Sequence, residues 1–190
     1  MRVGVYGGSF DPPHAGHLIL AADAVRNLDL HRLLFVPASV QPFKTAKTGG
    51  APPEARLEMV RLAIEGQKSF AAETVELDRG GLSYTVDTLE ELSRRNAGAE
   101  LFLIVGEDAA RELDRWRNPE RIRKLATVAV LRRHSVGAAS PLPDGLVEAS
   151  RRLVDLSSTE IRERVQAGNS IRGFVSEAVE HYIEANALYR

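Results

Sequence analysis

The chain contains no cysteine and a single tryptophan among its 190 residues. The lack of cysteine excludes disulfide bonds, thiolate catalysis and cysteine-ligated zinc, and it is consistent with a reducing compartment. No apolar run reaches the length of a membrane span, and the N-terminus has no basic stretch followed by a long apolar one, as a signal peptide would. We therefore expect a cytoplasmic protein without a membrane partner.

An excess of charge of either sign is also missing. The chain has 25 Lys and Arg against 26 Asp and Glu, which gives a formal net charge of −1 with neutral histidine. Such a chain has no overall field that attracts nucleic acid, and it lacks the basic, aromatic-rich strand typical of an RNA-binding module. We expect no nucleic-acid partner, so any polyphosphate must be bound by a local site.

Strand and helix patterns alternate along the chain. Apolar runs predict strands at residues 3–6, 33–36, 70–77, 101–105 and 127–131. Apolar residues at helical spacing predict helices around residues 57–64, 86–92, 161–165 and 175–183. A helix after the first strand is expected to bury Leu18, Ala21, Ala22, Val25 and Leu28. Loops are expected at about 38–53 and 133–145.

This alternation predicts an α/β fold, namely a Rossmann-like, doubly wound, mostly parallel sheet with helices on both faces. We expect a single domain of residues 1–190, with a small C-terminal helical part at about 156–190. Ligands of such sheets bind beyond the carboxyl ends of the strands. Because the fingerprint GxGxxG is absent, the sequence does not favour a dehydrogenase.

The most informative segment, GGSFDPPHAGH at residues 7–17, directly follows the first predicted strand. Its glycines allow the backbone to approach phosphate oxygens, and the N-terminus of the next helix offers unpaired N–H groups. His14 and His17 are three residues apart, so both imidazoles are expected on one face of the first helical turn. A glycine turn with two surface histidines is the alternative, but the pattern favours a nucleoside triphosphate site.

A second segment with phosphate-binding features, SSTEIR at residues 157–162, lies near the C-terminus. Ser157 and Glu160 have the spacing of a capping box, which alone would explain them as the start of a helix. Two further hydroxyls and Arg162 at a helix N-terminus also form an anion site. The two interpretations are compatible, and we expect both.

The segment at residues 7–17 resembles the extended HxGH signature of the bacterial nicotinate-nucleotide adenylyltransferases, which belong to the nucleotidylyltransferase superfamily. Further matches follow in the order of that family: QPFK (41–44), RLEM (56–59), SYTVDTL (83–89), GED (106–108), LDRW (113–116), SSTEIR (157–162) and GNSIR (168–172). The resemblance covers almost the whole chain. It implies a structural or loop-anchoring role for Arg56.

The resemblance is incomplete at two places. Phe43 stands where the family commonly has histidine, so Phe43 is given no role. LRRH at residues 131–134 departs from a family segment that usually reads RPG. Either Arg132 or Arg133 is expected to face the phosphates, and His134 is expected on the surface.

The resemblance implies an enzyme that transfers AMP from ATP to nicotinate mononucleotide, giving nicotinate adenine dinucleotide and pyrophosphate in NAD synthesis, without a covalent enzyme intermediate. The implied catalytic residues are His14, His17 and Arg162. The implied ATP and phosphate ligands are Gly7, Gly8, Ser9, Phe10, Lys44, Ser158 and Thr159. The implied nicotinate-nucleotide ligands are Thr85, Asp108 and Trp116. Mg²⁺ would bridge the phosphates through water and substrate oxygens rather than through a metal site of the protein.

Other interpretations remain open at this point. Thr85 and Asp108 also suit helix starts, and a lone Trp116 also suits a core. The family's relatives that use nicotinamide mononucleotide or phosphopantetheine, the cytidylyltransferases, and a non-catalytic nucleotide-binding regulatory domain are alternative functions. The choice between the acid and the amide mononucleotide depends on backbone geometry. The sequence does not indicate the oligomeric state, so a homo-oligomer is left open.

Overall fold

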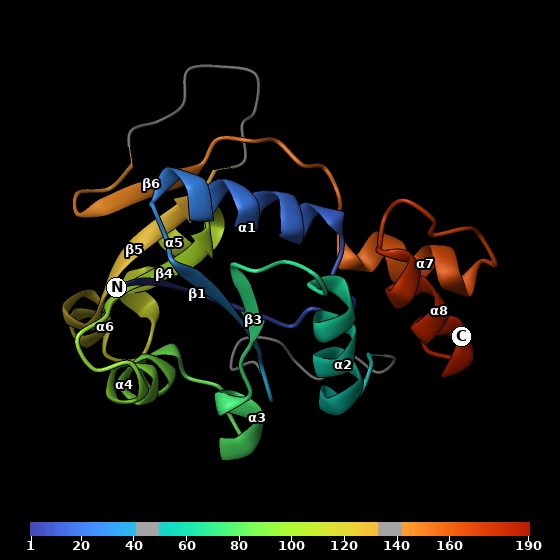
Figure 1. The fold of residues 1–190 in the computed structure, drawn as a ribbon, viewed down its shortest axis with the longest axis horizontal. Coiled ribbons are helices and arrows are strands. Elements are labelled where there is room, and N and C mark those ends of the chain that lie inside the picture. Colours follow the sequence, from blue (N-terminus) through green and yellow to red (C-terminus); the bar gives the residue numbers. More distant parts are fainter. Residues whose placement is uncertain (41–49, 133–141) are drawn as a thin grey trace.

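Six strands form one sheet at the centre of the molecule in the structure, a computed structural model that describes residues 1–40, 50–132 and 142–190 (Figure 1). The strands are β1 (Arg2–Gly8), β2 (Arg32–Pro37), β3 (Phe70–Ala72), β4 (Glu100–Gly106), β5 (Ala126–Leu131) and β6 (Leu146–Ser150). Their order is β3-β2-β1-β4-β5-β6, and every pairing between these strands is parallel. This is the strand order of the Rossmann fold, so the predicted fold class is confirmed.

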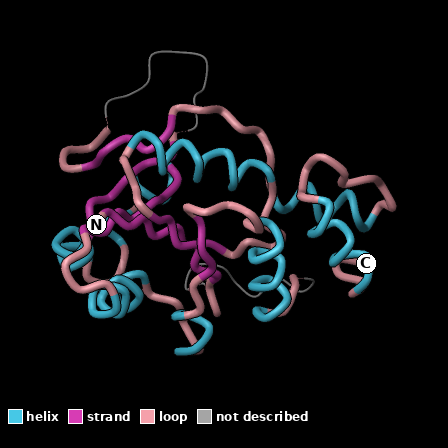
Figure 2. The backbone as a smooth tube through the Cα atoms, in the orientation of Figure 1, coloured by secondary structure: helices cyan, strands magenta, loops and turns pink. Residues whose placement is uncertain are grey.

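Helices cover both faces of the sheet (Figure 2). They are α1 (Ala15–Asn27), α2 (Pro53–Ala63), α3 (Val75–Arg79), α4 (Thr85–Arg95), α5 (Glu107–Arg111), the 3-10 turn η1 (Leu113–Arg115), α6 (Pro119–Leu125), α7 (Ser158–Gln166) and α8 (Glu177–Ala185). Side chains of β1 alternate between the faces. Val3 and Val5 pack in one cluster with α4 and α6, whereas Tyr6 packs in another with α1 and α2.

The two C-terminal helices pack beside α2 rather than over the middle of the sheet (Figure 1). Ile161 of α7 and Ile183 of α8 are fully buried in a third cluster with Met59 of α2. This cluster attaches the segment that carries the SSTEIR motif to the α/β part of the chain.

Side-chain caps define the starts of both C-terminal helices. The hydroxyl of Ser157 accepts a hydrogen bond from the N–H of Glu160 at 3.1 Å, which confirms the capping interpretation of this motif. The hydroxyl of Ser176 accepts from the N–H of Val179 at 3.4 Å, so α8 begins at Glu177 rather than at residue 175.

The predicted strand at residues 70–77 is wrong beyond Ala72. The chain turns into α3, where the hydroxyl of Thr74 donates to the carboxylate of Asp78 at 2.8 Å. Gly80, at φ 68°, ends this short helix. Val75 still packs against the sheet, so its apolar character marks burial but not a strand.

The sequence did not predict the short elements β6, α5 and α6. The buried face of α1 also differs from the prediction. Strand β6 lies at the sheet edge and buries only Ala149 and Ser150, so it lacks the continuous apolar run of a central strand. The helices α5 and α6 are too short for a clear period. In α1, Ala24 is buried and Ala22 is exposed, against the prediction. No helix in the described ranges is long and apolar enough to cross a membrane.

Candidate active site

The segment that joins β1 to α1 begins after Gly7 and Gly8. Gly7 and Gly8 do not form a turn, because both continue β1 and pair with β2, and Phe10 instead has the left-handed backbone, at φ 49°. The buried Phe10 ring lies 5.5 Å from the rings of Tyr6 and Phe35, measured between centroids. A Cβ at Gly8 would lie 3.1 Å from the Phe10 ring. The side chain of Phe10 therefore belongs to the core, so any contact of Phe10 with a ligand would involve its backbone.

The two histidines lie together at the start of α1, as predicted. His14 precedes the helix, His17 lies in its first turn, and their rings are stacked with centroids 3.7 Å apart. The backbone N–H of His14 donates to Nδ1 of His17 at 3.2 Å, so a neutral His17 carries its proton on Nε2. Burial lowers the pKa of the His14 imidazole to about 4. His14 is therefore an uncharged hydrogen-bonding group at neutral pH.

Asp11 connects this segment to two distant parts of the chain. Its Oδ1 accepts hydrogen bonds from the N–H of Ala51 at 2.9 Å and from the hydroxyl of Tyr189 at 2.6 Å. Burial and the Asp11 carboxylate raise the pKa of Tyr189 well above its usual value, so this hydroxyl remains a donor. A Cβ at Gly50 would lie 2.7 Å from Oδ2 of Asp11, so a larger residue there would require the Asp11 carboxylate to shift.

Side chains at the start of α7 hold the same segment. The hydroxyl of Ser158 donates to the carbonyl of Pro12 at 2.8 Å. Nη1 of Arg162 donates to the carbonyl of Asp11 at 2.7 Å, and Nη2 donates to the hydroxyl of Thr159 at 3.1 Å. Three predicted phosphate ligands are therefore brought to the chain segment that leads to the histidines.

Arg56 joins the ends of two strands to α2. Its buried guanidinium donates to the carbonyls of Ser9 at 2.7 Å, Ala38 at 2.6 Å and Ala51 at 3.2 Å. Burial lowers the pKa of this side chain, and the nearby carboxylate of Asp11 opposes that effect. Arg56 is a structural anchor, as the sequence predicted.

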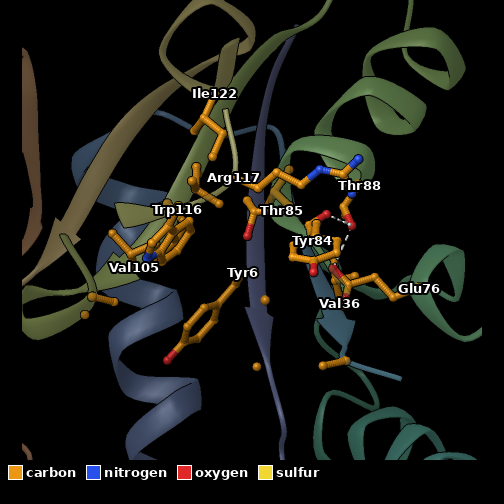
Figure 3. Close-up of a pocket in the computed structure, with 18 residues that line it drawn as sticks. Tyr6, Val36, Glu76, Tyr84, Thr85, Thr88, Val105, Trp116, Arg117 and Ile122 are labelled. Carbon is orange, nitrogen blue, oxygen red and sulfur yellow. Dashed lines mark hydrogen bonds between the residues drawn. The ribbon is translucent and has the colours of Figure 1, made fainter. Parts of the chain in front are cut away.

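A cavity of about 280 Å³ opens beside the carboxyl ends of β1 and β4 (Figure 3). These neighbouring strands flank the point where the strand order reverses, which is where open α/β sheets bind their ligands. Of the predicted site residues, the cavity is lined by Gly7, Gly8, Thr85 and Trp116.

The predicted residues thus fall into two groups near the end of β1. One group lines the cavity, and the other, which gathers at the starts of α1 and α7, contains His14, His17, Ser158, Thr159 and Arg162. Asp108 does not line the cavity and is exposed in the first turn of α5.

Sequence reasoning missed most of the side chains that line the cavity, and Glu76, Tyr84 and Arg117 are polar or charged examples. Glu76 is buried, and its Oε1 accepts a hydrogen bond from the hydroxyl of Thr88 at 2.7 Å. Burial raises the pKa of the Glu76 carboxyl. Tyr84 and Arg117 also line the cavity, with the guanidinium carbon 4.7 Å from the centroid of the Tyr84 ring. Tyr84 lies within the SYTVDTL segment and Arg117 directly follows Trp116, so their positions in the sequence next to predicted site residues could have indicated them.

Some predicted residues lie outside the described part of the chain: Phe43, Lys44, Arg133 and His134. Arg132 is described and buried at the end of β5. Its Nη atoms lie 3.8 Å from Oε1 of Glu107 and 3.7 Å from Oε2 of Glu148. Its surroundings are therefore acidic side chains of α5 and β6.

The low pKa of His14 predicts acid sensitivity. The pKa of His14 is about 4 in the folded protein, below the ordinary value of 6.5. As the pH falls from 6.5 towards 4, the unfolded chain therefore binds the proton before the folded protein does, and the free energy of unfolding decreases. Between pH 7.5 and 4.5 the wild type should lose roughly 2–3 kcal/mol more free energy of unfolding than His14→Asn. Urea unfolding at both pH values measures this, and equal losses in the two proteins would contradict the assignment.

The bond from Tyr189 to Asp11 predicts a specific loss of stability. Tyr189→Phe removes a buried donor to a carboxylate and should lower the free energy of unfolding by about 1–3 kcal/mol. Tyr182→Phe in α8 is the matched control, because its hydroxyl makes no hydrogen bond to any described residue. Urea unfolding at pH 7 compares the two variants. The same small change in both would show that the Asp11 bond contributes nothing.

Comparison with known proteins agrees with this geometry. The sequence matches the cytidylyltransferase-like family over residues 5–164. A protein of Gemmatimonas aurantiaca is 46% identical over 198 residues, covering 100% of this chain and 93% of its own. A protein of Thermus thermophilus is 47% identical over 191 residues and covers 100% of both chains. Both carry the name "Probable nicotinate-nucleotide adenylyltransferase".

Solved structures share the fold. The nicotinic acid mononucleotide adenylyltransferase of Plasmodium falciparum, complexed with NaAD, superposes with a TM-score of 0.80 at 19% identity, covering 99% of this chain and 97% of its own. A second structure of that enzyme, complexed with APC, superposes with a TM-score of 0.77 at 19% identity, covering 99% and 96%. From the family match and the full-length relatives, the chain belongs to the cytidylyltransferase-like family and, within it, to the nicotinate-nucleotide adenylyltransferases.

Proposed function

We propose that this nucleotidyltransferase transfers AMP from ATP to nicotinate mononucleotide, giving nicotinate adenine dinucleotide and pyrophosphate in NAD synthesis. One observation carries the proposal. A cavity large enough for a pyridine ring lies close to the imidazoles of His14 and His17 at the start of α1. Gly7 and Gly8 line the cavity, and the segment that follows them leads to His14. A mononucleotide and a triphosphate can therefore bind on either side of the end of β1.

The chemistry is an in-line displacement at phosphorus. An oxygen of the mononucleotide 5′-phosphate attacks the α-phosphorus of ATP, the new O–P bond forms, and the bond to the bridging oxygen of the β-phosphate breaks as pyrophosphate leaves. The nucleophile is already anionic, so no strong general base is needed, and no covalent enzyme intermediate is involved. Catalysis then rests on positioning and on stabilisation of the charge that develops on phosphate oxygens.

The imidazoles act as hydrogen-bond donors to the α- and β-phosphates. His17 accepts from the backbone at Nδ1, which leaves the proton of the neutral ring on Nε2 as the hydrogen-bond donor. His14 is neutral, so it donates without introducing a permanent charge into a buried position. At the start of α1, the N–H of Ala15 donates to the carbonyl of Phe174 at 2.8 Å and that of His17 donates to the carbonyl of His14 at 2.9 Å, so the imidazoles rather than these N–H groups serve as donors.

The remaining phosphate ligands act around this pair. Arg162, Ser158 and Thr159 hold the leaving pyrophosphate from the start of α7, supported by their position against the segment at residues 11–12. The backbone from Gly7 to Phe10 approaches the phosphates at the carboxyl end of β1. Lys44 adds a positive charge.

The nicotinate end occupies the cavity. Trp116 provides an aromatic face on which a flat, electron-poor pyridine ring can stack, and Thr85 supplies polar groups at the start of α4. Asp108 is exposed in the first turn of α5 and does not line the cavity, and we assign its carboxylate to accept hydrogen bonds from ribose hydroxyls outside the ring-binding space.

Mg²⁺ enters with ATP as part of the substrate. In the described ranges, no group of three or more His, Asp or Glu side chains forms a metal site. The ion would be held by phosphate oxygens and water, as Mg²⁺ commonly is in phosphoryl-transfer enzymes. A cytoplasmic location remains a prediction from the sequence, which leaves the oligomeric state open.

The acceptor assay tests the function. Pyrophosphate release from ATP and Mg²⁺ should be fast with nicotinate mononucleotide and slow with nicotinamide mononucleotide or phosphopantetheine. A preference for either of the other acceptors would retain adenylyl transfer and overturn the substrate. Folded protein that binds ATP but releases no pyrophosphate with any acceptor would support a regulatory domain instead.

His17→Ala tests the phosphate site. Loss of a donor to transition-state charge should lower kcat by at least about 100-fold, while thermal unfolding stays close to that of the wild type. His181→Ala is the matched control, because His181 is exposed on α8. Steady-state kinetics with saturating ATP give the comparison. Near-wild-type turnover of His17→Ala would contradict the assigned role.

A further inference from the structure

One motif of the sequence, GNSIR at residues 168–172, has no role in the proposed reaction. It lies in the turn that joins α7 to α8, and none of its residues lines the cavity (Figure 1). The turn continues to Phe174, which makes a hydrogen bond to the start of α1, where the two imidazoles lie. This bond connects the motif to the phosphate side of the active site.

The bond holds the peptide unit between His14 and Ala15. The N–H of Ala15 donates to the carbonyl of Phe174 at 2.8 Å. The carbonyl of the same peptide unit, that of His14, accepts from the N–H of His17 at 2.9 Å. Both polar groups of this planar unit are therefore bonded, and Phe174 supplies the partner from outside α1. Because the Cα of His14 lies in the same plane, the orientation of the unit determines where the imidazole points.

The imidazoles have little room to compensate for a shift of this peptide. The ring of His14 is buried and stacks on the ring of His17, with centroids 3.7 Å apart. A Cβ at Gly16 would lie 3.0 Å from both Nδ1 of His14 and Cγ1 of Val154, so the ring is packed closely against the first turn of α1. A displaced His14–Ala15 peptide would therefore move both rings.

Two residues of the turn direct the Phe174 carbonyl towards α1. Ile171 is buried in the third cluster with Ile161 of α7, and its carbonyl accepts from the N–H of Phe174 at 3.0 Å. Gly173, between them, has φ 82°, a left-handed conformation that favours glycine. The position of the carbonyl thus depends on the backbone of Gly173.

The ring of Phe174 is held by α7. The guanidinium carbon of Arg164 lies 4.2 Å from the centroid of this ring, a cation–π contact. Nε of Arg164 also donates to Oε1 of Glu160 at 3.2 Å. Arg162, the proposed ligand of the leaving pyrophosphate, lies on the same helix. The turn therefore connects the imidazoles to the helix that carries the other phosphate ligands.

We propose that the turn at residues 168–174 positions the imidazoles of His14 and His17 for adenylyl transfer, through the hydrogen bond between Phe174 and Ala15. The inference rests on the proposed function, because it concerns the donors of the same reaction. Phe174 is a positioning residue, since it acts through the imidazoles. The bond keeps these donors at a fixed separation from Arg162, as a reaction that relies on positioning requires.

Gly173→Ala tests the proposal. A Cβ at Gly173 would meet no described atom within 4 Å beyond its chain neighbours, so the substitution adds only the strain of the left-handed backbone. Relief of that strain turns the Phe174 carbonyl away from Ala15. We expect kcat to fall by roughly tenfold, while KM for nicotinate mononucleotide stays within about twofold of the wild type. Steady-state kinetics with saturating ATP measure both constants.

Gly98→Ala is the matched control. Gly98 has φ 80°, a Cβ there would also meet no described atom, and it lies before the amino end of β4, whereas the site lies at the carboxyl ends of the strands. Urea unfolding should show similar losses of stability in the two variants, but Gly98→Ala should keep the wild-type kcat. Equal losses of kcat in both variants, or an unchanged kcat in Gly173→Ala, would overturn the proposal.

Substitutions of Arg164 give a second measurement. Arg164→Gln removes the cation from the Phe174 ring and should lower kcat by about threefold, whereas Arg164→Lys keeps a cation there and should recover most of the loss. Arg95→Gln removes an ion pair of the same spacing, with Glu91 on α4, and should leave kcat unchanged. An unchanged kcat in Arg164→Gln, or an equal loss with lysine, would count against the proposal.

NMR of the imidazole ring protons separates this inference from the proposed function, because it needs no substrate. In Gly173→Ala the signals of His14 and His17 should shift while that of the exposed His31 stays, and in Gly98→Ala the signals of His14 and His17 should stay. Shifted signals in a protein that transfers no AMP would refute the proposed function and retain the positioning role. Transfer of AMP at an unchanged rate, with unshifted signals in Gly173→Ala, would do the reverse.

Discussion

The geometry of the phosphate site depends on the hydrogen bonds that hold the segment between β1 and α1. Asp11 accepts from Ala51 and Tyr189 through its side chain and from Arg162 through its backbone carbonyl. Ser158 binds the next carbonyl along. Because these donors come from Ala51 before α2, from the first turns of α7 and from Tyr189 after α8, the segment leading to the histidines is positioned by three parts of the chain at once.

The two halves of the site use polar groups in opposite ways. On the phosphate side, His14 and Arg56 are buried and closely surrounded, so their geometry is fixed and their charge states respond to burial. On the cavity side, the guanidinium of Arg117 is half exposed and weakly paired. A fixed donor array suits a reaction whose developing charge always appears at the same atoms.

The parts of the fold that were predictable are those with a strong local signal. The apolar runs of β1, β2, β4 and β5 are continuous because these strands are covered on both faces. At the sheet edges this signal fails. Strand β6 has few buried residues, and the segment after Ala72 keeps apolar residues while a Thr74–Asp78 hydrogen bond turns it into a helix.

The sequence by itself determined the fold class, the pairing of His14 with His17 and the family, because each follows from residues that are neighbours in the chain. The tertiary structure decided what surrounds them. The bond between Asp11 and Tyr189 joins residues 178 positions apart, and the cavity places Glu76 and Arg117 on one lining from separate elements. Such contacts follow from how helices pack on the sheet, a property that no local pattern of residues carries.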